Sequence, residues 1–243
     1  MEFRFKKFSL AHEHSTMKIG TDAVLLAALT DAQDAHSLLD IGCGCGVVAF
    51  CIAQQMAHLQ QTPTIYGIDN DLPSIEEAKR NARHYPLLPP DCFHFVHIRL
   101  QDWTLQECQP KFDLIVSNPP FFGNDLKPTN ASRLKSKHRD NQLSFEELIL
   151  NVDKLLNEKG RFALILPVTE AEEFQQLAAS YFHLTQKTTI RPTAKKPAHR
   201  VVLEYARQPE SEAVTANSLT IRNEKNEYTS EYLLRVKPYL TLG

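Results

Sequence analysis

A short segment that combines an asparagine with two prolines and two phenylalanines offers the most specific chemistry in the chain. It runs Ser117-Asn118-Pro119-Pro120-Phe121-Phe122. The prolines fix the backbone and remove N–H donors, so the preceding carbonyls have no competing donor beside them. The Asn118 side-chain oxygen and the Pro119 main-chain oxygen can then accept both hydrogens of a planar NH₂ group, which turns its lone pair toward an electrophile. Phe121 or Phe122 can stack on the ring that bears the amine.

A glycine-rich turn forms a second chemical motif. It reads Asp40-Ile41-Gly42-Cys43-Gly44-Cys45-Gly46, follows an apolar run and opens into a segment with helical periodicity. Glycines let the backbone turn sharply and approach a ligand closely. The spacing is G-x-G-x-G, whereas a dinucleotide site uses G-x-G-x-x-G to place a pyrophosphate at a helix N-terminus. The motif therefore favours a ligand without a pyrophosphate, and a tight strand-to-helix turn is the alternative.

Two acidic residues follow the next apolar runs. The segment Tyr66-Gly67-Ile68-Asp69-Asn70 places Asp69 at the end of a strand, where it can accept hydrogen bonds from both hydroxyls of a ribose. The segment Gln101-Asp102-Trp103 supplies a second acid that can accept from the exocyclic amine of an adenine ring. A polar turn is the alternative for Asp102. These acids are the predicted partners of a ribose and an adenine.

The elements that must position these residues follow from hydrophobic periodicity. Short apolar runs alternate with longer segments of helical period, which predicts an α/β fold with a mostly parallel sheet and helices on both faces. The predicted strands are Ser37–Ile41, Thr64–Asp69, Phe93–Ile98, Phe112–Ser117 and Arg161–Leu166. The predicted helices are Thr21–Thr30, Val47–Leu59, Pro73–His84, Ser144–Asn157 and Glu170–Tyr181. Ser144 with Glu147 forms a capping pair, Pro73 suits a first helical turn, and Gly160 is expected to end a helix.

The pattern changes after Tyr181. Leu184–Ile190 and Arg200–Tyr205 alternate in polarity and are joined by a proline-containing loop, which predicts an antiparallel pair that closes one edge of the sheet. A polar stretch then leads to a strand at Leu219–Arg222 and a helix at Ser230–Tyr239. The first residues, Glu2–Leu10, are expected to form a short strand or arm.

Composition places the chain among ordinary globular proteins. Of its 243 residues, 42% are hydrophobic and 23% charged, which allows one substantial core. Apolar runs stay shorter than the roughly 18 residues of a transmembrane helix, and the opening MEFRFKKFSL lacks the apolar stretch of a secretory signal, so we expect a cytoplasmic protein. The formal net charge of −2 gives no general argument for nucleic-acid binding, which would have to use local basic patches.

The cysteines carry little chemical signal. They are Cys43, Cys45, Cys51, Cys92 and Cys108, an odd set without C-x-x-C spacing. This pattern favours reduced, buried side chains over a disulfide framework or a zinc site, and no metal is expected.

The order DIGCGCG, YGIDN, LQDW and NPPFF resembles the class I S-adenosylmethionine-dependent methyltransferases, in the branch that methylates amino groups. The match covers roughly residues 35–167. The flanking segments KIGTDAVLL, KKPAHRV and YTSEYL resemble the bacterial family that methylates N6 of the adenosine 3′ of the anticodon in tRNA1(Val). The resemblance implies a Rossmann-like fold, S-adenosylmethionine as cofactor and tRNA as partner, with residues 1–34 as an arm and a cofactor-covering helix and 35–243 as the methyltransferase domain.

The resemblance also implies roles for individual residues. Gly42, Gly44 and Gly46 would surround the amino-acid end of the cofactor, with Asp40 in the same motif. Thr21 and Asp22 would lie over its methionine portion, unless they only cap a helix. The ribose and adenine would be bound by Asp69, Asn70, Gln101 and Asp102, and Asn118 would also contact the cofactor. Asn118, Pro119, Pro120 and Phe121 would form the target-base site, in which Phe121 replaces a tyrosine that relatives often carry, so stacking is possible and a hydroxyl role is excluded.

Two basic clusters are the predicted contacts to tRNA phosphates, with solvated loops as the alternative. The first comprises Lys127, Arg133, Lys135, Lys137 and Arg139, and the second Lys195, Lys196 and Arg200. Phe122 joins Phe121 as a predicted base contact.

Other functions remain open on the sequence alone. Within methyltransferases they are guanine-N2 methylation of rRNA, methylation of a glutamine amide in a protein, and adenine-N6 methylation of DNA. A non-catalytic cofactor- or RNA-binding module would not need Asn118-Pro119-Pro120. A nicotinamide dehydrogenase is disfavoured by the G-x-G-x-G spacing.

Overall fold

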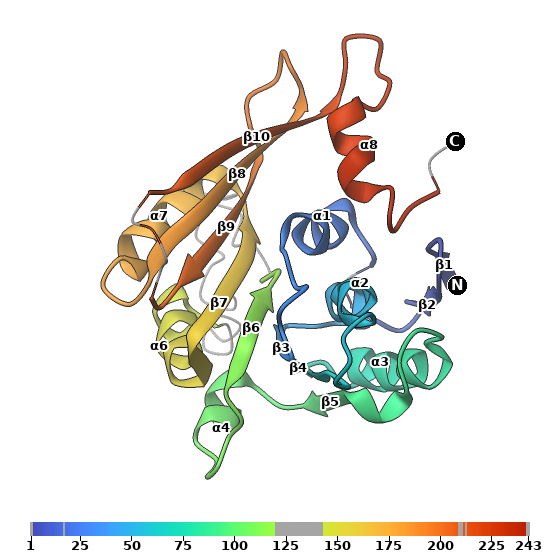
Figure 1. Ribbon diagram of the computed structural model, residues 1–243, viewed down its shortest axis with the longest axis vertical. Helices are drawn as coiled ribbons and strands as arrows, with labels where there is room; N and C mark the ends of the chain where they lie inside the picture. Colours follow the sequence, from blue (N-terminus) through green and yellow to red (C-terminus); the bar gives the residue numbers. More distant parts are fainter. Residues whose placement is uncertain (1, 17, 120–142, 209–210, 212, 242–243) are drawn as a thin grey trace, which may run out of the picture.

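One large twisted sheet forms the centre of the molecule (Figure 1). The computed structural model describes residues 2–16, 18–119, 143–208, 211 and 213–241. Within these residues the sheet has eight strands in the order β10-β8-β9-β7-β6-β3-β4-β5. The strands are β3 (Ser37–Ile41), β4 (Thr64–Asp69), β5 (Phe93–His97), β6 (Phe112–Ser117), β7 (Leu156–Leu166), β8 (His183–Thr193), β9 (Arg200–Ala206) and β10 (Thr215–Arg222).

Helices connect the strands and cover both faces of the sheet. They are α1 (Thr21–Leu29), α2 (Val47–Met56), α3 (Leu72–His84), α4 (Leu100–Thr104), α6 (Phe145–Leu155), α7 (Val168–Ala178) and α8 (Ser230–Val236), with a 3₁₀ turn at Pro90–Cys92. Successive side chains of a strand point to opposite faces, so Leu38 and Leu39 of β3, both fully buried, belong to different apolar clusters. The cluster around Leu38 packs on α1, α2, α3 and α8. The cluster around Leu39 packs on α4, α6 and α7.

The strand order places a switch point between β3 and β6. From β3 the chain winds through α2 to β4 on one side and later returns through β6 on the other side. In open α/β sheets, ligands bind outside the carboxyl ends of the strands at such a point. The fold thus predicts a site at the ends of β3 and β6.

Several expected elements are confirmed. β3, β4 and β6 have the predicted bounds, and α2, α3, α6 and α7 lie within three residues of their predicted starts and ends. Ser144 and Glu147 form the complete capping box, and Pro73 lies in the first turn of α3. The mostly parallel sheet with helices on both faces is also as predicted.

Three expectations are wrong. β8 and β9 are antiparallel, but β9 also pairs antiparallel with β7, and β10 extends the sheet beyond β8, so the reversed strand lies inside the sheet rather than at its edge. Gly160 does not end a helix but lies within β7, where a Cβ would lie 2.8 Å from the carbonyl oxygen of Phe112. The third wrong expectation is that all the cysteines are buried, because Cys108 is exposed.

The first residues form a small hairpin of β1 (Glu2–Arg4) and β2 (Ser9–Ala11). Phe5 and Phe8, in its turn, stack on each other, and Phe8 contacts Tyr85 after α3. The Lys6 main-chain N–H donates to the carbonyl of Tyr239 at 2.8 Å. The hairpin is therefore fixed between α3 and the segment that follows α8.

Candidate functional site

The ends of three neighbouring strands bring the predicted ligand residues to one place. Ile41 of β3 pairs with Ile68 of β4 on one side and with Ser117 of β6 on the other. The Ser117 hydroxyl also donates to the Ile41 carbonyl at 2.9 Å. The glycine turn, Asp69 and Asn118 directly follow these three paired residues. They consequently lie side by side at the carboxyl edge of the sheet.

The glycine turn is held by Asp69. Gly42, Gly44 and Gly46 all have positive φ, of 72°, 53° and 87°. One carboxylate oxygen of Asp69 accepts from the Gly44 N–H at 2.8 Å and the other from the Asp71 N–H at 2.9 Å. Burial raises the pKa of Asp69. A carboxylate offers about four lone-pair positions, so acceptor capacity remains for ribose hydroxyls.

Asp40, in β3, bonds to the helix that follows the glycine turn. Its buried side chain accepts a hydrogen bond from the Ala49 N–H in the first turn of α2 at 3.1 Å. Burial raises the pKa of Asp40 from 3.8 to about 7. Between these two pH values the folded protein binds a proton that the unfolded chain does not, so the free energy of unfolding falls as the pH rises. Asp40 is placed to anchor α2.

Asp40→Asn should remove this part of the pH dependence. The amide keeps an oxygen for the Ala49 N–H but cannot ionise. Between about pH 5.5 and about pH 7.5, the wild-type free energy of unfolding should fall by about 2 kcal/mol more than that of the variant. Urea denaturation at a series of pH values measures the difference, and parallel pH profiles of the two proteins would contradict the role given to Asp40.

Asn118 presents an acceptor at the end of β6. The residue is half-buried and Pro119 is buried. The Asn118 Oδ1 atom is itself buried, and no hydrogen-bond partner for it exists in the described part of the chain. An unsatisfied buried oxygen costs free energy, and such groups in a native structure point to a bound partner or a catalytic role. As far as the described residues are concerned, this atom therefore has its lone pairs available for an incoming NH₂ group.

Asp22 and Arg200 form a half-buried ion pair at the same edge of the sheet. Arg200 Nε lies 2.7 Å from Asp22 Oδ2, and each side chain is 24% exposed. The pair joins the first turn of α1 to the start of β9. The cap of α1 is Gly20 without a side-chain bond, so neither Thr21 nor Asp22 is the N-cap, and that alternative is wrong.

Asp102 lies on α4, a five-residue helix that was not among the predicted helices, so the alternative of a polar turn is wrong. Its carboxylate makes two bonds to Arg99, at 2.7 and 2.8 Å, and this pairing lowers the pKa of Asp102. Asp102 is exposed, Gln101 beside it is half-buried, and Asn70 is exposed at the end of β4. The role of Asp102 as acceptor for an adenine amine stays a prediction. In that role Asp102 would use the carboxylate lone pairs that Arg99 does not occupy.

Two loops carry basic residues at the same edge. The loop between β8 and β9 includes Lys195 and Lys196, and the loop after β10 includes Lys225, all exposed. Lys195 pairs with Glu224 at 3.1 Å, which joins the two loops. Arg222 lies over the ring of Tyr228 at 4.0 Å. We refer to the loops at residues 194–199 and 223–229 as the twin loops.

Part of the predicted site falls outside the described residues. These positions are Pro120, Phe121, Phe122, Lys127, Arg133, Lys135, Lys137 and Arg139. Their predicted roles stay predictions.

The glycine turn has room for a ligand. A Cβ at Gly42 would meet no heavy atom within 4 Å, whereas one at Gly46 would lie 2.7 Å from the Phe50 ring. The exposed Gly42 backbone thus borders open space beside Asp69 and Asn118. The Asp69 carboxylate and the Asn118 oxygen supply acceptors beside the turn, and acceptors of this kind match the hydroxyls and amine of the predicted ligands. No three His, Cys, Asp or Glu side chains among the described residues are grouped as a metal site.

Sequence reasoning missed the residues that bind the arm to this site. Ser74, Glu77 and Asn81 of α3 are buried polar residues whose partners lie in residues 11–16. The signal was present, because positions spaced by three and four along a helix share a face. This polar spacing on the buried face of α3 was not used.

Comparison with known proteins places the chain in one group. Residues 4–183 match the methyltransferase small domain family. A protein of Trichodesmium erythraeum named tRNA1(Val) (adenine(37)-N6)-methyltransferase is 33% identical over 98% of this chain and 97% of its own length. A protein of the same name from Pseudoalteromonas translucida is also 33% identical, over 98% and 97%.

Solved structures show the same fold at low sequence identity. A predicted O-methyltransferase from Agrobacterium tumefaciens has a TM-score of 0.63 at 18% identity and covers 89% of this chain and 95% of its own. The 16S rRNA N2 G1207 methyltransferase of Thermus thermophilus, solved with AdoMet and guanosine, has a TM-score of 0.56 at 19% identity and covers 86% and 50%.

Proposed function

The chain belongs to the methyltransferase small domain family and, within it, to the tRNA1(Val) (adenine(37)-N6)-methyltransferases, and on that premise we propose that it methylates N6 of adenosine 37 in a tRNA. S-adenosylmethionine is the cofactor that this family implies. The observation that carries the proposal is the buried Oδ1 atom of Asn118 beside the glycine turn, which has no hydrogen-bond partner among the described residues. An adenine N6 amine offers the hydrogens that this oxygen lacks.

The proposed reaction is a direct methyl transfer that the protein promotes by alignment. Bound S-adenosylmethionine supplies an electrophilic methyl group on a positively charged sulfur. Asn118 Oδ1 and the Pro119 carbonyl accept the two N6 hydrogens and aim the nitrogen lone pair. The N–C bond forms as the C–S bond breaks, and the methylated nitrogen then releases one proton to solvent. No described histidine is needed as a base.

Each remaining residue has a proposed task in binding. Asp69 accepts from the ribose hydroxyls with the lone pairs that Gly44 and Asp71 leave free, and Gly42 lets the backbone approach the amino-acid end. Asp102 accepts from the adenine amine. Adenosine 37 lies in a single-stranded loop, where a base can be splayed out at modest cost. Because tRNA is the proposed substrate, we expect the protein to act in the cytoplasm.

The domain arrangement is likewise a proposal. Residues 1–34 would act as the arm and helix that cover the cofactor, and residues 35–243 as the methyltransferase domain. None of the helices in the described ranges has the length and apolar character that spanning a bilayer requires.

The twin loops are the proposed contact to tRNA phosphates outside the target base. Lys195 and Lys196 lie there, at the edge of the sheet that carries Asn118. The exposed ion pair of Lys195 with Glu224 contributes little, so a phosphate can replace it. Each phosphate contact releases counterions, which makes binding salt-dependent.

Lys195→Ala together with Lys196→Ala should weaken tRNA binding and flatten its salt dependence. The slope of log K against log salt should decrease in magnitude by roughly 1 to 2, because about 0.7 to 0.9 is lost per phosphate contact. A matched control replaces two exposed lysines by alanine, Lys154 in the last turn of α6 and Lys159 near the start of β7. If both double variants change the slope equally, the twin loops are not a phosphate site.

The function is tested with purified protein, S-adenosylmethionine and unmodified tRNA1(Val), followed by nuclease digestion and mass spectrometry. N6-methyladenosine should appear in the wild-type tRNA and not in a transcript with guanosine at position 37. Methylation of the guanosine transcript or of rRNA instead would favour a guanine-N2 or other RNA target. Modification of a protein amide would overturn the RNA substrate.

A further inference from the structure

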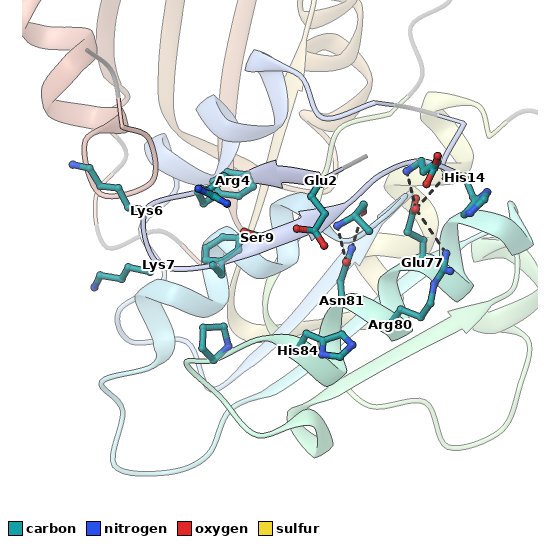
Figure 2. A pocket seen from close by; sticks show the side chains of 15 residues that line it. Glu2, Arg4, Lys6, Lys7, Ser9, His14, Glu77, Arg80, Asn81 and His84 are labelled. Atoms are coloured by element: carbon teal, nitrogen blue, oxygen red, sulfur yellow. Dashed lines mark hydrogen bonds and ion pairs between the residues drawn. The ribbon is translucent and has the colours of Figure 1, made fainter.

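A buried glutamate of α3 holds a turn of the N-terminal arm against the glycine turn. The Glu77 side chain is fully buried, and its carboxylate accepts from three consecutive main-chain N–H groups. Oε1 accepts from Glu13 at 2.7 Å and His14 at 3.1 Å, and Oε2 from Ser15 at 2.9 Å. Figure 2 shows Glu77 and His14 at a groove between the hairpin and α3, whose volume is about 630 Å³. We call residues 12–16 the arm turn.

The other side of the arm turn is held by a lysine. Lys18 Nζ donates to the carbonyls of His12 and Glu13 at 2.8 Å each and of Ser15 at 3.2 Å. The amides of the turn therefore face Glu77, and its carbonyls face Lys18. Main-chain groups with charged partners on both sides have little freedom to rearrange.

Two further residues of α3 connect the arm to the glycine turn. Asn81 accepts from the Ala11 N–H at 2.9 Å, and its amide donates to the carbonyls of Ala11 and Cys45 at 3.0 Å each. The Ser15 and Ser74 hydroxyls lie 2.9 Å apart. The Ser15 side chain also approaches the glycine turn, because a Cβ at Gly44 would lie 3.5 Å from the Ser15 hydroxyl.

The position of the arm turn bears directly on the proposed cofactor site. Gly44, which Ser15 approaches, donates its N–H to Asp69. After the arm turn the chain enters α1, whose Asp22 pairs with Arg200 at the carboxyl edge. One buried carboxylate thus fixes a segment that touches the glycine turn and leads to the first turn of α1.

We propose that Glu77 is a positioning residue for S-adenosylmethionine, acting through the arm turn that it holds against Gly44. This inference rests on the proposed function only for the identity of the cofactor. A carboxylate that is buried without paired cations at close range is costly unless its acceptors are satisfied, which three amides do here. Arg80 lies 3.8 Å away and is half exposed, so the main-chain bonds dominate.

Glu77→Gln tests the proposal by removing the charge at nearly constant volume. The amide has one acceptor oxygen and places an NH₂ group against main-chain donors. In the protein without cofactor, hydrogen exchange of the amides of residues 13–15 should become more than about tenfold faster. The Kd for S-adenosylhomocysteine, measured by calorimetry, should rise about tenfold. The KM for S-adenosylmethionine should rise similarly while kcat changes less than about threefold.

Glu76→Gln is the matched control. Glu76 precedes Glu77 on α3, but its side chain is exposed and, among the described residues, pairs with Lys79 on the same helix. This variant should leave exchange and Kd unchanged. Faster exchange in Glu77→Gln with an unaltered Kd would overturn the proposal, because the arm turn would then be structural only.

Lys18→Met keeps the proposal testable if Glu77→Gln folds poorly. Lys18 is exposed, so its replacement does not disturb the core, yet it removes the donor to three carbonyls of the arm turn. Exchange and Kd should change in the same direction as for Glu77→Gln, and an unchanged Kd would count against the proposal. Hydrogen exchange and the Kd are measured without tRNA, and only the KM and kcat require it, so a failure to methylate tRNA would overturn the substrate without touching this inference.

Discussion

Asn118→Ala should lower kcat for tRNA methylation by about a thousandfold, while the Kd for S-adenosylmethionine stays within about twofold. Removing one preorganised polar partner of a transition state typically costs about 10² to 10³ in rate, and loss of alignment adds to this. Asn118 Oδ1 has no partner in the described chain, so alanine breaks no protein hydrogen bond at that atom. Single-turnover methylation and calorimetry with the cofactor provide the two measurements.

The stability of the same variant is the control. An unsatisfied buried oxygen is costly, so its removal should leave the midpoint of urea unfolding unchanged or slightly higher. Asn118→Asp keeps an acceptor oxygen at the same position and should retain more activity than Asn118→Ala. An alanine variant with near-wild-type kcat would show that Asn118 does not orient the amine.

Gly46→Ala should lower the free energy of unfolding by about 2 to 5 kcal/mol. Gly46 has a φ of 87°, which disfavours any residue with a Cβ. The added Cβ would lie 2.7 Å from Phe50 and 3.1 Å from Phe95, both buried in the cluster under α2. The backbone strain and the overpacking add, and urea denaturation measures their sum.

Gly42→Ala separates these two effects. Gly42 also has a positive φ, of 72°, but its Cβ would enter open space. The variant should lose only about 1 to 2 kcal/mol of stability. Because this space is the proposed cofactor site, Gly42→Ala should weaken cofactor binding more than its stability loss suggests. Equal stability losses at both glycines would mean that Phe50 and Phe95 move aside at little cost.

The central strands were predictable because their signals are local. Ser37–Ile41, Thr64–Asp69 and Phe112–Ser117 are buried apolar runs ended by glycine, aspartate or asparagine, and their bounds were predicted to the residue. The prediction that Gly160 ends a helix was wrong because the conformation of this segment is set by pairing with β6 rather than by its neighbours in sequence. The place of β9 depends on β10, which pairs with β8 from more than 20 residues away, a contact without a local pattern.

The residues of the site likewise divide into those that local sequence patterns predict and those that depend on distant contacts. Asp69 and Asn118 could be predicted because each ends a strand, and the parallel pairing of β3, β4 and β6 then brings them together. The contact between Glu77 and the arm turn could not be predicted. The bonded residues are 62 to 64 positions apart, and the arm turn binds through main-chain atoms that carry no sequence signal. Arg200 was predicted as a phosphate contact, and its pairing with Asp22 became visible only in the structure.

The contact of the N-terminal hairpin with the segment after α8 has a consequence for biosynthesis. Lys6 binds the carbonyls of Lys237 and Tyr239, and the first of these bonds spans 231 positions. At about 5 to 20 residues per second, a ribosome needs roughly 10 to 50 seconds to make that span. Throughout this interval Lys6 lacks both of these carbonyl partners. The hairpin therefore receives its C-terminal contacts last, and the main-chain N–H of Lys6 should become protected from hydrogen exchange only after the segment that follows α8 has been made.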